Sequence, residues 1–234
     1  MLSKVPIFNA SLDILPSTKL LISTINAHSY NIYLEDIDFR HAINSSNIVL
    51  PDGISIVLGM KLLGGKKLKK IAGNDLFDYE MQYLQYIKGK GFFLGSSNEV
   101  LEKIYRRASF EFPSVTLATY SPPYKDIFSK EDNNQIINAI NDFHPDVLFI
   151  GMTAPKQEKW AFDHFNELQV GHVCCIGAVF DFYAGTVKRA PQWMINSGLE
   201  WLFRLIKEPR RMWRRYLIGN LKFIFAIFKE KYRL

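Results

Sequence analysis

Two kinds of hydrophobic pattern alternate along this chain. Short runs of consecutive apolar residues are typical of buried strands, and apolar residues three and four positions apart are typical of helices. The expected strands are Leu20–Thr24, Ile48–Leu50, Gly91–Gly95, Val115–Tyr120, Val147–Gly151 and Val173–Gly177. The expected helices are Ile37–Asn44, Ile54–Leu63, Leu76–Lys88, Glu99–Phe110, Asn134–Phe143, Lys156–Leu168 and Trp193–Lys207. This alternation predicts an α/β fold with a Rossmann-like open, largely parallel sheet flanked by helices.

A last helix is expected from Arg210 towards Tyr232, separated from its predecessor by Pro209. Its apolar residues at helical spacing are Trp213, Leu217, Leu221, Ile224 and Phe228. We therefore expect an α/β core over residues 1–190 and a helical, basic appendage over residues 191–234.

Composition places the chain among ordinary globular proteins. Its 234 residues are 48% hydrophobic, which suffices for a sizeable core without disulfides. Cys174 and Cys175 are adjacent, so on a strand they point to opposite faces and do not pair; this favours a reducing compartment. The segment Met1 to Leu15 has no apolar region typical of a secretory signal, and no apolar run approaches the ~20 residues of a membrane span.

The positive charge of the chain is concentrated at its end. From Pro209 to Leu234 there are eight basic residues and one acidic residue, whereas the rest of the chain carries a net charge of −1. A basic body would have suggested nucleic acid, which we do not expect as a partner. A basic tail with interleaved aromatic residues suggests a membrane surface or a polyanionic ligand instead.

Polar or glycine-containing clusters follow five of the expected strands. They are Thr24–Asn26, Pro51–Gly53, Gly95–Ser97, Gly151–Pro155 and Gly177–Asp181. In a parallel sheet the crevice beyond the carboxyl ends of the strands is where ligands bind. The alternative is that these residues only form turns and cap the helices that follow.

Asp52 is the candidate general base, because a carboxylate at this edge could accept a proton from a substrate. Thr24 and Asn26 could orient a substrate hydroxyl or amide nearby. The alternative is that Asp52 caps the next helix.

A second cluster opens the helix expected from Lys156. Pro155 suits the first helical position, so Ala154 would be the cap and would leave backbone N–H groups free for an anion or a carbonyl. Alternatively the Thr153 side chain caps the helix, and Gln157 and Glu158 are ordinary polar residues of its first turn.

Cofactor and metal sites are not expected. Gly89 and Gly91 precede a strand instead of following one, which excludes a dinucleotide-binding fingerprint, although a nucleotide could rest at the turn from Gly95. Asp36-Ile37-Asp38 resembles a metal-binding D-x-D motif, but the residues after it favour a helix start. The histidines show no metal-ligand spacing.

Several arginines gather near the end of the chain. Glu200 and Arg204 are four residues apart and could form a helical ion pair. Four more cations lie in the first turns of the last helix, where they oppose its dipole: Arg210, Arg211, Arg214 and Arg215. This placement suits a polyanion such as a leaving diphosphate.

Together these strings resemble a known family. In chain order they are Thr24-Ile25-Asn26, Pro51-Asp52-Gly53, Ala72-Gly73-Asn74-Asp75-Leu76, Ala154-Pro155-Lys156-Gln157-Glu158 with Trp160, Phe180-Asp181, Arg189-Ala190-Pro191, Leu199-Glu200-Trp201 with Arg204, and Glu208-Pro209-Arg210. The chain resembles the WecG/TagA/CpsF glycosyltransferases (carbohydrate-enzyme family 26) from about Leu20 to Tyr216.

The resemblance implies an inverting, metal-independent transferase of N-acetylmannosamine-type sugars. The donor would be a UDP-sugar and the acceptor N-acetylglucosamine on a polyprenyl diphosphate, at the cytoplasmic face of the membrane. Asp52 would be the catalytic base. The expected substrate contacts are Thr24, Asn26, Lys70, Gly95, Gln157, Glu158, Asp181 and Arg189. The expected diphosphate contacts are Arg204, Arg210, Arg211, Arg214 and Arg215, on a C-terminal segment that also contacts the membrane.

Two departures from the family pattern bear on the substrate. Lys70 stands near a position where the family often has arginine, and a lysine keeps the charge without the bidentate fork. The segment Tyr120 to Tyr124 differs from the glycine and aromatic residue that many members have there, so contact with the donor would change the sugar expected. The alternatives are another UDP-hexose or uronic acid donor, a sugar-nucleotide epimerase or dehydrogenase, and a non-catalytic nucleotide-binding membrane adaptor. A homo-oligomer is compatible with the sequence.

Overall fold

The computed structural model describes residues 1–232 and contains one open sheet of six parallel strands. The strands lie in the order β2-β1-β6-β5-β3-β4. They are β1 (Leu20–Ile25), β2 (Ile48–Pro51), β3 (Lys90–Gly95), β4 (Thr116–Tyr120), β5 (Val147–Gly151) and β6 (His172–Cys175). Each expected strand is present, and the predicted α/β fold with a parallel sheet is confirmed.

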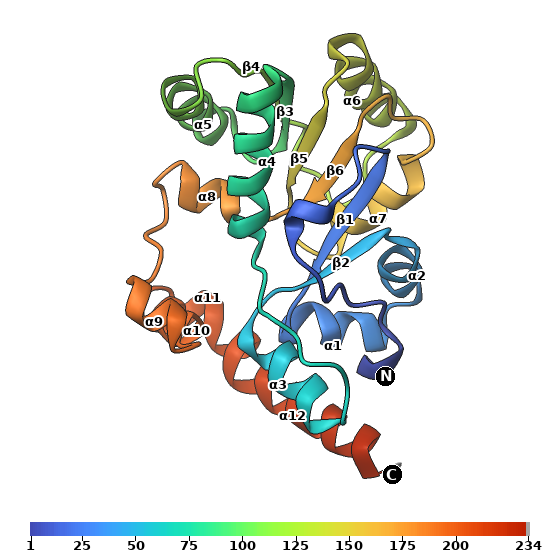
Figure 1. Ribbon diagram of the computed structural model, residues 1–234, viewed down its shortest axis with the longest axis vertical. Helices are drawn as coiled ribbons and strands as arrows, with labels where there is room; N and C mark the ends of the chain where they lie inside the picture. Colours follow the sequence, from blue (N-terminus) through green and yellow to red (C-terminus); the bar gives the residue numbers. More distant parts are fainter. Residues whose placement is uncertain (233–234) are drawn as a thin grey trace.

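Helices connect the strands and cover the sheet (Figure 1). The α-helices are α1 (Ala27–Glu35), α2 (Ile37–Ser45), α3 (Ile54–Leu62), α4 (Gly73–Ile87), α5 (Asn98–Glu111), α6 (Lys130–Phe143), α7 (Lys156–His164), α8 (Val179–Tyr183), α9 (Gln192–Asn196), α10 (Glu200–Lys207), α11 (Pro209–Trp213) and α12 (Gly219–Tyr232). Short 3-10 helices occur at Leu2–Lys4 (η1) and Leu12–Ile14 (η2). A π-helical segment, Arg214–Ile218 (η3), joins α11 to α12.

The helices differ from the sequence expectation in several places, among them the short helix α8, which was not predicted. The helix expected over Trp193–Lys207 is interrupted, because Gly198 adopts a φ of +72° that ends α9 before α10 begins. The helix expected to reach Leu168 ends at His164. The helix α1 was not predicted, although Asn26 and Ser29 form a capping box at its start.

The core has two layers, one on each face of the sheet. Phe93 and Phe149 pack with α4 and α5 on one face, and Phe92 and Leu148 pack with α6 and α7 on the other. Cys174 and Cys175 are both buried and free, and they face opposite layers as their adjacency predicted. Because helices cover both faces of the sheet, consecutive side chains of a strand are all buried, and each strand is therefore a continuous apolar run in the sequence.

The end of the chain returns to its beginning. In Figure 1 the red C-terminal helix α12 lies beside α3 and ends near the N-terminus. Phe223 and Ile227 of α12 are buried in a cluster that includes Leu2. Glu230 accepts hydrogen bonds from the backbone N–H groups of Leu2 at 2.6 Å and Ser3 at 2.9 Å. Apolar packing and the hydrogen bonds to Glu230 therefore both attach the last helix to the start of the chain.

The predicted stripe on this last helix is not the side that packs. Leu221, Ile224 and Phe228 are 68%, 48% and 45% exposed, whereas Phe223 and Ile227 are buried. Within residues 1–232, no helix combines the length and the apolar character needed to cross a bilayer.

Candidate active site

One cavity of about 560 Å³ opens beyond the carboxyl ends of the strands, within the described part of the chain. Its walls come from the segments after β1, β2, β3, β5 and β6, and from α3 and the C-terminal helices. This is the edge at which parallel sheets bind ligands, and the volume suits a small molecule of nucleotide-sugar size.

Asp52 lies at the end of β2 and lines this cavity. Asn26 Nδ2 donates to Asp52 Oδ2 at 3.3 Å. Burial raises the pKa of Asp52 and Glu200 adds to the rise, whereas Asn26, Lys70 and Arg215 oppose it. The carboxyl is thus held at the cavity with a raised affinity for protons, as a general base requires.

The capping alternative for Asp52 is wrong. The N-cap of α3 is Gly53, which adopts a φ of +106° and provides no side-chain cap. The backbone N–H of Asp52 donates to the Ile25 carbonyl at 2.8 Å, which ties β2 to β1 and leaves the carboxylate free of a helix terminus.

Asn26 does have the structural role that was the alternative for its cluster. Its Oδ1 accepts from the backbone N–H groups of His28 and Ser29 at 3.0 and 3.1 Å, which caps α1. The same capping bonds fix the carboxamide so that Nδ2 reaches Asp52. Thr24, two residues earlier, is largely buried and lines the cavity.

The start of α7 differs in detail from the sequence expectation. Pro155 is the N-cap and α7 begins at Lys156, so Pro155 is not the first helical residue and Ala154 is not the cap. Thr153 contributes its backbone carbonyl, which accepts from Lys156 N at 2.9 Å, and its side chain does not cap the helix. Gln157 and Glu158 are buried and line the cavity. They are therefore not ordinary polar residues of an exposed first turn.

The Glu200 carboxylate lies among the cationic side chains that line the cavity. Glu200 Oε2 is 4.0 Å from Lys70 Nζ, and Glu200 Oε1 is 3.4 Å from Arg189 Nε. The expected helical pair of Glu200 with Arg204 is absent from residues 1–232. The Arg204 guanidinium instead lies over the Phe182 ring, 5.3 Å from its centroid. Glu200 therefore pairs with Lys70 and Arg189 instead of with Arg204 on its own helix.

Three arginines of the C-terminal helices line the cavity: Arg204, Arg211 and Arg215. Arg211 Nη1 is 2.8 Å from Glu208 Oε2. The Nε atoms of Arg204 and Arg215 are buried and have no hydrogen-bond partner within residues 1–232. Burial and the nearby Arg204 and Arg211 lower the pKa of Arg215, whereas Tyr216 and Asp52 oppose this shift. This group of cations can hold an anionic ligand.

Most of the predicted site residues meet at the cavity. Those that line it are Thr24, Asn26, Asp52, Lys70, Gln157, Glu158, Asp181, Arg189, Arg204, Arg211 and Arg215. Arg210 and Arg214 are exposed and do not line it. Gly95 does not line it either, because Gly95 packs against the Gly151 backbone while the next residue, Ser96, reaches the cavity. None of residues 120–124 lines it, so the variant loop after β4 gives no reason to expect a different sugar.

Sequence reasoning missed His28 and Glu200. His28 lines the cavity in the turn after β1, and burial together with Arg215 lowers its pKa to about 4. In the sequence, the sign that His28 could reach the site was its position two residues after Asn26. Glu200 was expected only in a local pair with Arg204, and its place in the cavity was missed because its partners lie elsewhere in the chain.

The acidic D-x-D segment forms a helix start. Asp36 Oδ1 accepts from Phe39 N at 3.0 Å, and Lys159 Nζ lies 2.6 Å from Asp36 Oδ2. Among residues 1–232 there is no group of three or more His, Cys, Asp or Glu side chains arranged to hold a metal ion.

The cavity continues into an apolar groove between α3 and α12. Its lining includes Leu58 and Leu62 of α3 and Ile224, Ile227 and Phe228 of α12. We refer to these five residues as the α3–α12 groove. Leu58, Leu62, Ile224 and Phe228 are partly exposed, so this end of the cavity is open to the surroundings and apolar.

Comparison with known proteins gives consistent matches over nearly the whole chain. The model of the glycosyl transferase WecG/TagA/CpsF family matches residues 7–234. A Bacillus subtilis (strain 168) protein named N-acetylglucosaminyldiphosphoundecaprenol N-acetyl-beta-D-mannosaminyltransferase is 31% identical over 211 residues, which cover 90% of this chain and 80% of the relative. Proteins of the same name from Bacillus spizizenii and Staphylococcus aureus (strain MW2) are 31% and 28% identical, cover 82% and 93% of this chain, and are themselves covered over 72% and 83% of their lengths.

Proposed function

Because this chain belongs to the WecG/TagA/CpsF family of glycosyltransferases, we propose that it transfers N-acetylmannosamine from UDP to a polyprenyl-diphosphate-linked N-acetylglucosamine. The observation that carries the proposal is one cavity lined by a carboxylate with a raised pKa, Asp52, and by cations from separate parts of the chain. The product would serve teichoic-acid-type or related cell-surface polysaccharide synthesis.

In the proposed reaction Asp52 accepts the proton of the attacking acceptor hydroxyl. The acceptor oxygen bonds to the anomeric carbon of the sugar while the bond from that carbon to the UDP oxygen breaks. The electron pair of that bond leaves with the diphosphate. A single displacement of this kind inverts the anomeric configuration, and it needs one base and no nucleophilic residue of the enzyme.

The cations of the cavity are suited to the departing diphosphate. Arg204, Arg211 and Arg215 come from the C-terminal helices, and Lys70 comes from the segment before α4. Guanidinium groups bind phosphate oxygens with charge-assisted bonds and stabilise charge that develops as UDP leaves. We propose that these side chains supply the charge stabilisation and that the transfer is metal-independent.

The α3–α12 groove supports a lipid-linked acceptor. An apolar groove that opens from the catalytic cavity could hold the beginning of a polyprenyl chain while its diphosphate stays near the arginines. Exposed lysines occur on or next to both helices that form the groove: Lys61, Lys66, Lys67 and Lys69 at and after α3, and Lys222, Lys229 and Lys231 on α12. We propose that this face binds the anionic inner surface of the cell membrane peripherally, each cation contributing ~1 kcal/mol.

Liposome binding tests the membrane part of the proposal. Replacing Lys222, Lys229 and Lys231 with glutamine should weaken binding to anionic vesicles and spare turnover on a water-soluble acceptor. Arg233, another basic residue of this end of the chain, lies outside the described residues. Unchanged vesicle binding at physiological salt would remove the membrane proposal.

A mass-spectrometric screen of UDP-sugars against a short-chain polyprenyl diphosphate N-acetylglucosamine tests the reaction itself. Transfer from UDP-N-acetylmannosamine, with UDP released only when the acceptor is present, is the expected result. Transfer from another UDP-hexose or a uronic acid would change the donor. Binding of UDP without transfer from any donor would favour a non-catalytic adaptor.

A further inference from the structure

Two buried polar side chains at the start of α7 have incomplete hydrogen bonding. Gln157 is 3% exposed and Glu158 is 1% exposed. Gln157 Nε2 donates to Glu158 Oε1 at 2.8 Å. Within residues 1–232, Gln157 Oε1 and Glu158 Oε2 are buried and have no hydrogen-bond partner. Because buried polar atoms are almost always paired, these two acceptor oxygens need a hydrogen that an ionised Glu158 does not have.

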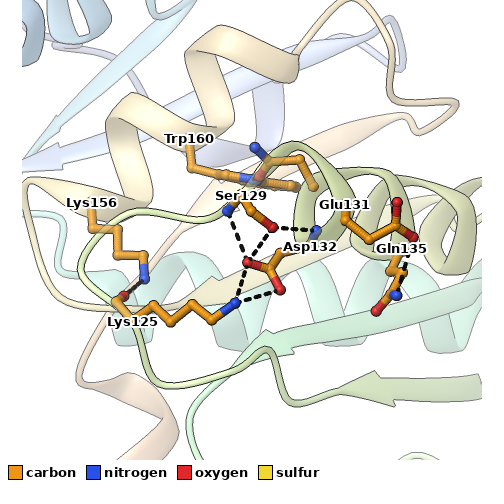
Figure 2. A network of polar contacts seen from close by, with 8 residues as sticks. Lys125, Ser129, Glu131, Asp132, Gln135, Lys156 and Trp160 are labelled. Atoms are coloured by element: carbon orange, nitrogen blue, oxygen red, sulfur yellow. Dashed lines mark hydrogen bonds and ion pairs between the residues drawn. The ribbon is translucent and has the colours of Figure 1, made fainter.

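No cation in the described part of the chain compensates a negative charge on Glu158. On the same helix, the Lys156 ammonium donates to the Lys125 backbone carbonyl, as Figure 2 shows. The other lysine of the first turns, Lys159, lies 2.6 Å from Asp36 Oδ2 of α2. Both nearby ammonium groups are therefore engaged elsewhere.

The remaining neighbours of α7 place no positive charge at Glu158: Arg40 of α2 donates instead to the backbone carbonyls of Tyr33 and Leu34. The segment β1 contains no titratable side chain. On β6 the titratable neighbour is Cys175, whose thiol donates to the Gln157 backbone carbonyl at 3.9 Å. Burial raises the pKa of Cys175 well above its usual value, so this thiol is neutral. The cations that line the same cavity, Lys70 and Arg215 among them, form no ion pair with Glu158.

A protonated Glu158 carboxyl group carries no charge and has a hydrogen to share with the unpaired oxygens. Burial raises the pKa of Glu158 from its usual 4.5 to about 7, and it outweighs the hydrogen bonds from Gln157 and from the Glu158 backbone N–H, which lower the pKa. An isolated buried carboxylate is so unfavourable that the group takes up a proton instead. A proton on Oε2 supplies the hydrogen that the two unpaired oxygens lack.

We propose that Glu158 is a positioning residue that, as a neutral carboxylic acid, closes a doubly hydrogen-bonded ring with the Gln157 carboxamide beside the cavity. In this ring Glu158 Oε2 donates to Gln157 Oε1, and Gln157 Nε2 donates one hydrogen to Glu158 Oε1. The second hydrogen on Nε2 remains for a substrate oxygen. Loss of the Glu158 proton places two acceptors opposite each other and opens the ring, so the carboxamide loses its fixed orientation. The inference rests on the proposed glycosyl transfer and adds a second titrating group to it.

The pH dependence of kcat tests the ring. In the unaltered protein kcat should fall as pH rises through the Glu158 pKa of about 7. Glu158→Gln keeps a donor and an acceptor but cannot ionise, so its descending limb should move to higher pH. Glu158→Ala cannot form the ring, and its kcat should fall by about tenfold or more at every pH. Turnover of the glutamine variant should exceed that of the alanine variant.

Glu80→Gln is the matched control for replacing a buried glutamate. Glu80 is also fully buried, but it lies on α4 and pairs with His172 at the start of β6, outside the cavity lining. Its replacement should leave the position of the descending limb unchanged. If Glu158→Gln lost turnover as Glu158→Ala does, or kept the limb near pH 7, the neutral ring would be ruled out.

Thermal unfolding gives a second readout that needs no activity. A glutamate whose folded pKa exceeds its unfolded pKa binds more protons when folded, so its contribution to stability falls as pH rises between the two values. The Tm of Glu158→Gln minus that of the unaltered protein should therefore grow from about pH 4.5 to about pH 7 and then level off. A constant difference would mean that Glu158 is ionised when folded, which would overturn the inference. Because thermal unfolding needs no turnover, it tests the protonation of Glu158 even if the screen of UDP-sugars shows no transfer.

Discussion

Asp52 is the single residue on which the proposed chemistry depends most. Gly53 takes the capping position beside it, and Asn26 Nδ2 holds one of its carboxylate oxygens, so no helix terminus competes for the charge. The raised pKa means that the carboxyl becomes a base only as pH rises through a value above its usual one.

Asp52→Asn should lower kcat by roughly 10²–10⁴-fold, because the acceptor hydroxyl loses its proton acceptor. The ascending limb of the pH profile should disappear with it, and the Kd of UDP should barely change. Steady-state kinetics and calorimetry check these outcomes. Asp36→Asn is the control, since Asp36 caps α2 outside the cavity lining and should affect stability only. Near-normal turnover of Asp52→Asn would refute the assignment.

The buried pair of His172 and Glu80 should make stability depend on pH. His172 Nδ1 lies 2.8 Å from Glu80 Oε1, and Nε2 lies 3.0 Å from the Pro16 carbonyl. Although burial opposes it, the Glu80 carboxylate raises the pKa of His172 above 6.5. The folded state thus binds the proton more tightly, and this stabilisation is complete below pH 6.5 and is lost as pH rises through the folded value. The Tm advantage over His172→Gln should shrink accordingly; a constant advantage would mean that the histidine is neutral.

At the scale of elements, the π-helical segment η3 brings arginines to two different surroundings. Arg215 turns into the cavity, and Arg214 lies at the surface over the Trp213 ring. A π turn inside an α-helix shifts the side chains that follow it relative to regular helical spacing, and such turns are frequent at functional sites. The helical spacing of the apolar residues in the sequence does not reveal this shift.

Arg215→Gln and Arg211→Gln should each lower kcat by roughly 10²-fold, because the leaving diphosphate loses charge-assisted hydrogen bonds. Arg210→Gln and Arg214→Gln, on the same helical run but outside the cavity lining, should have much smaller effects. Turnover on a water-soluble acceptor is the measurement, since it separates this role from membrane binding. Equal losses at all four positions would indicate a general effect of charge.

The α3–α12 groove should recognise the lipid chain of the acceptor. Leu58→Ser and Phe228→Ser should each raise the KM of a long-chain acceptor by about tenfold through lost apolar contact, and they should leave the KM of a chain-free acceptor unaltered. Leu221→Ser is the control, because Leu221 is exposed on α12 but does not line the groove. Equal effects of Leu58→Ser and Leu221→Ser, measured without vesicles, would argue for a diffuse apolar surface.

For the whole molecule, the C-terminal helices belong to both the core and the cavity. A chain that ends at Glu208 lacks Phe223 and Ile227 from the core and Arg211 and Arg215 from the cavity. Its Tm should fall by about 5–10 °C, and turnover on a soluble acceptor should be lost. Full activity of this truncated chain would contradict the role given to the arginines. The division near residue 190 stays a prediction.

The sequence predicts this fold well where the chain follows strong local patterns. All six strands were located because their apolar runs are bounded by glycine or polar residues. The edge at which the cavity opens was predicted from a second rule, that parallel strands bring their carboxyl ends to one edge of the sheet. The α1 helix and the break at Gly198 were missed because they depend on a capping box and a positive φ, not on periodicity. The pairing of Glu200 with Lys70 and Arg189 joins separate segments, so local spacing pointed to the wrong partner.

The order of the strands also has a consequence for how the protein is made. The strand β6, the last of the six in the sequence, lies between β1 and β5 and alone joins the β1–β2 pair to the other three strands. Glu230, near the end of the chain, holds residues at its very beginning. During synthesis the ribosome releases the first residues long before the last ones. The complete cavity can therefore form only after β6 and the C-terminal helices have left the ribosome, so a shorter nascent chain lacks part of its walls.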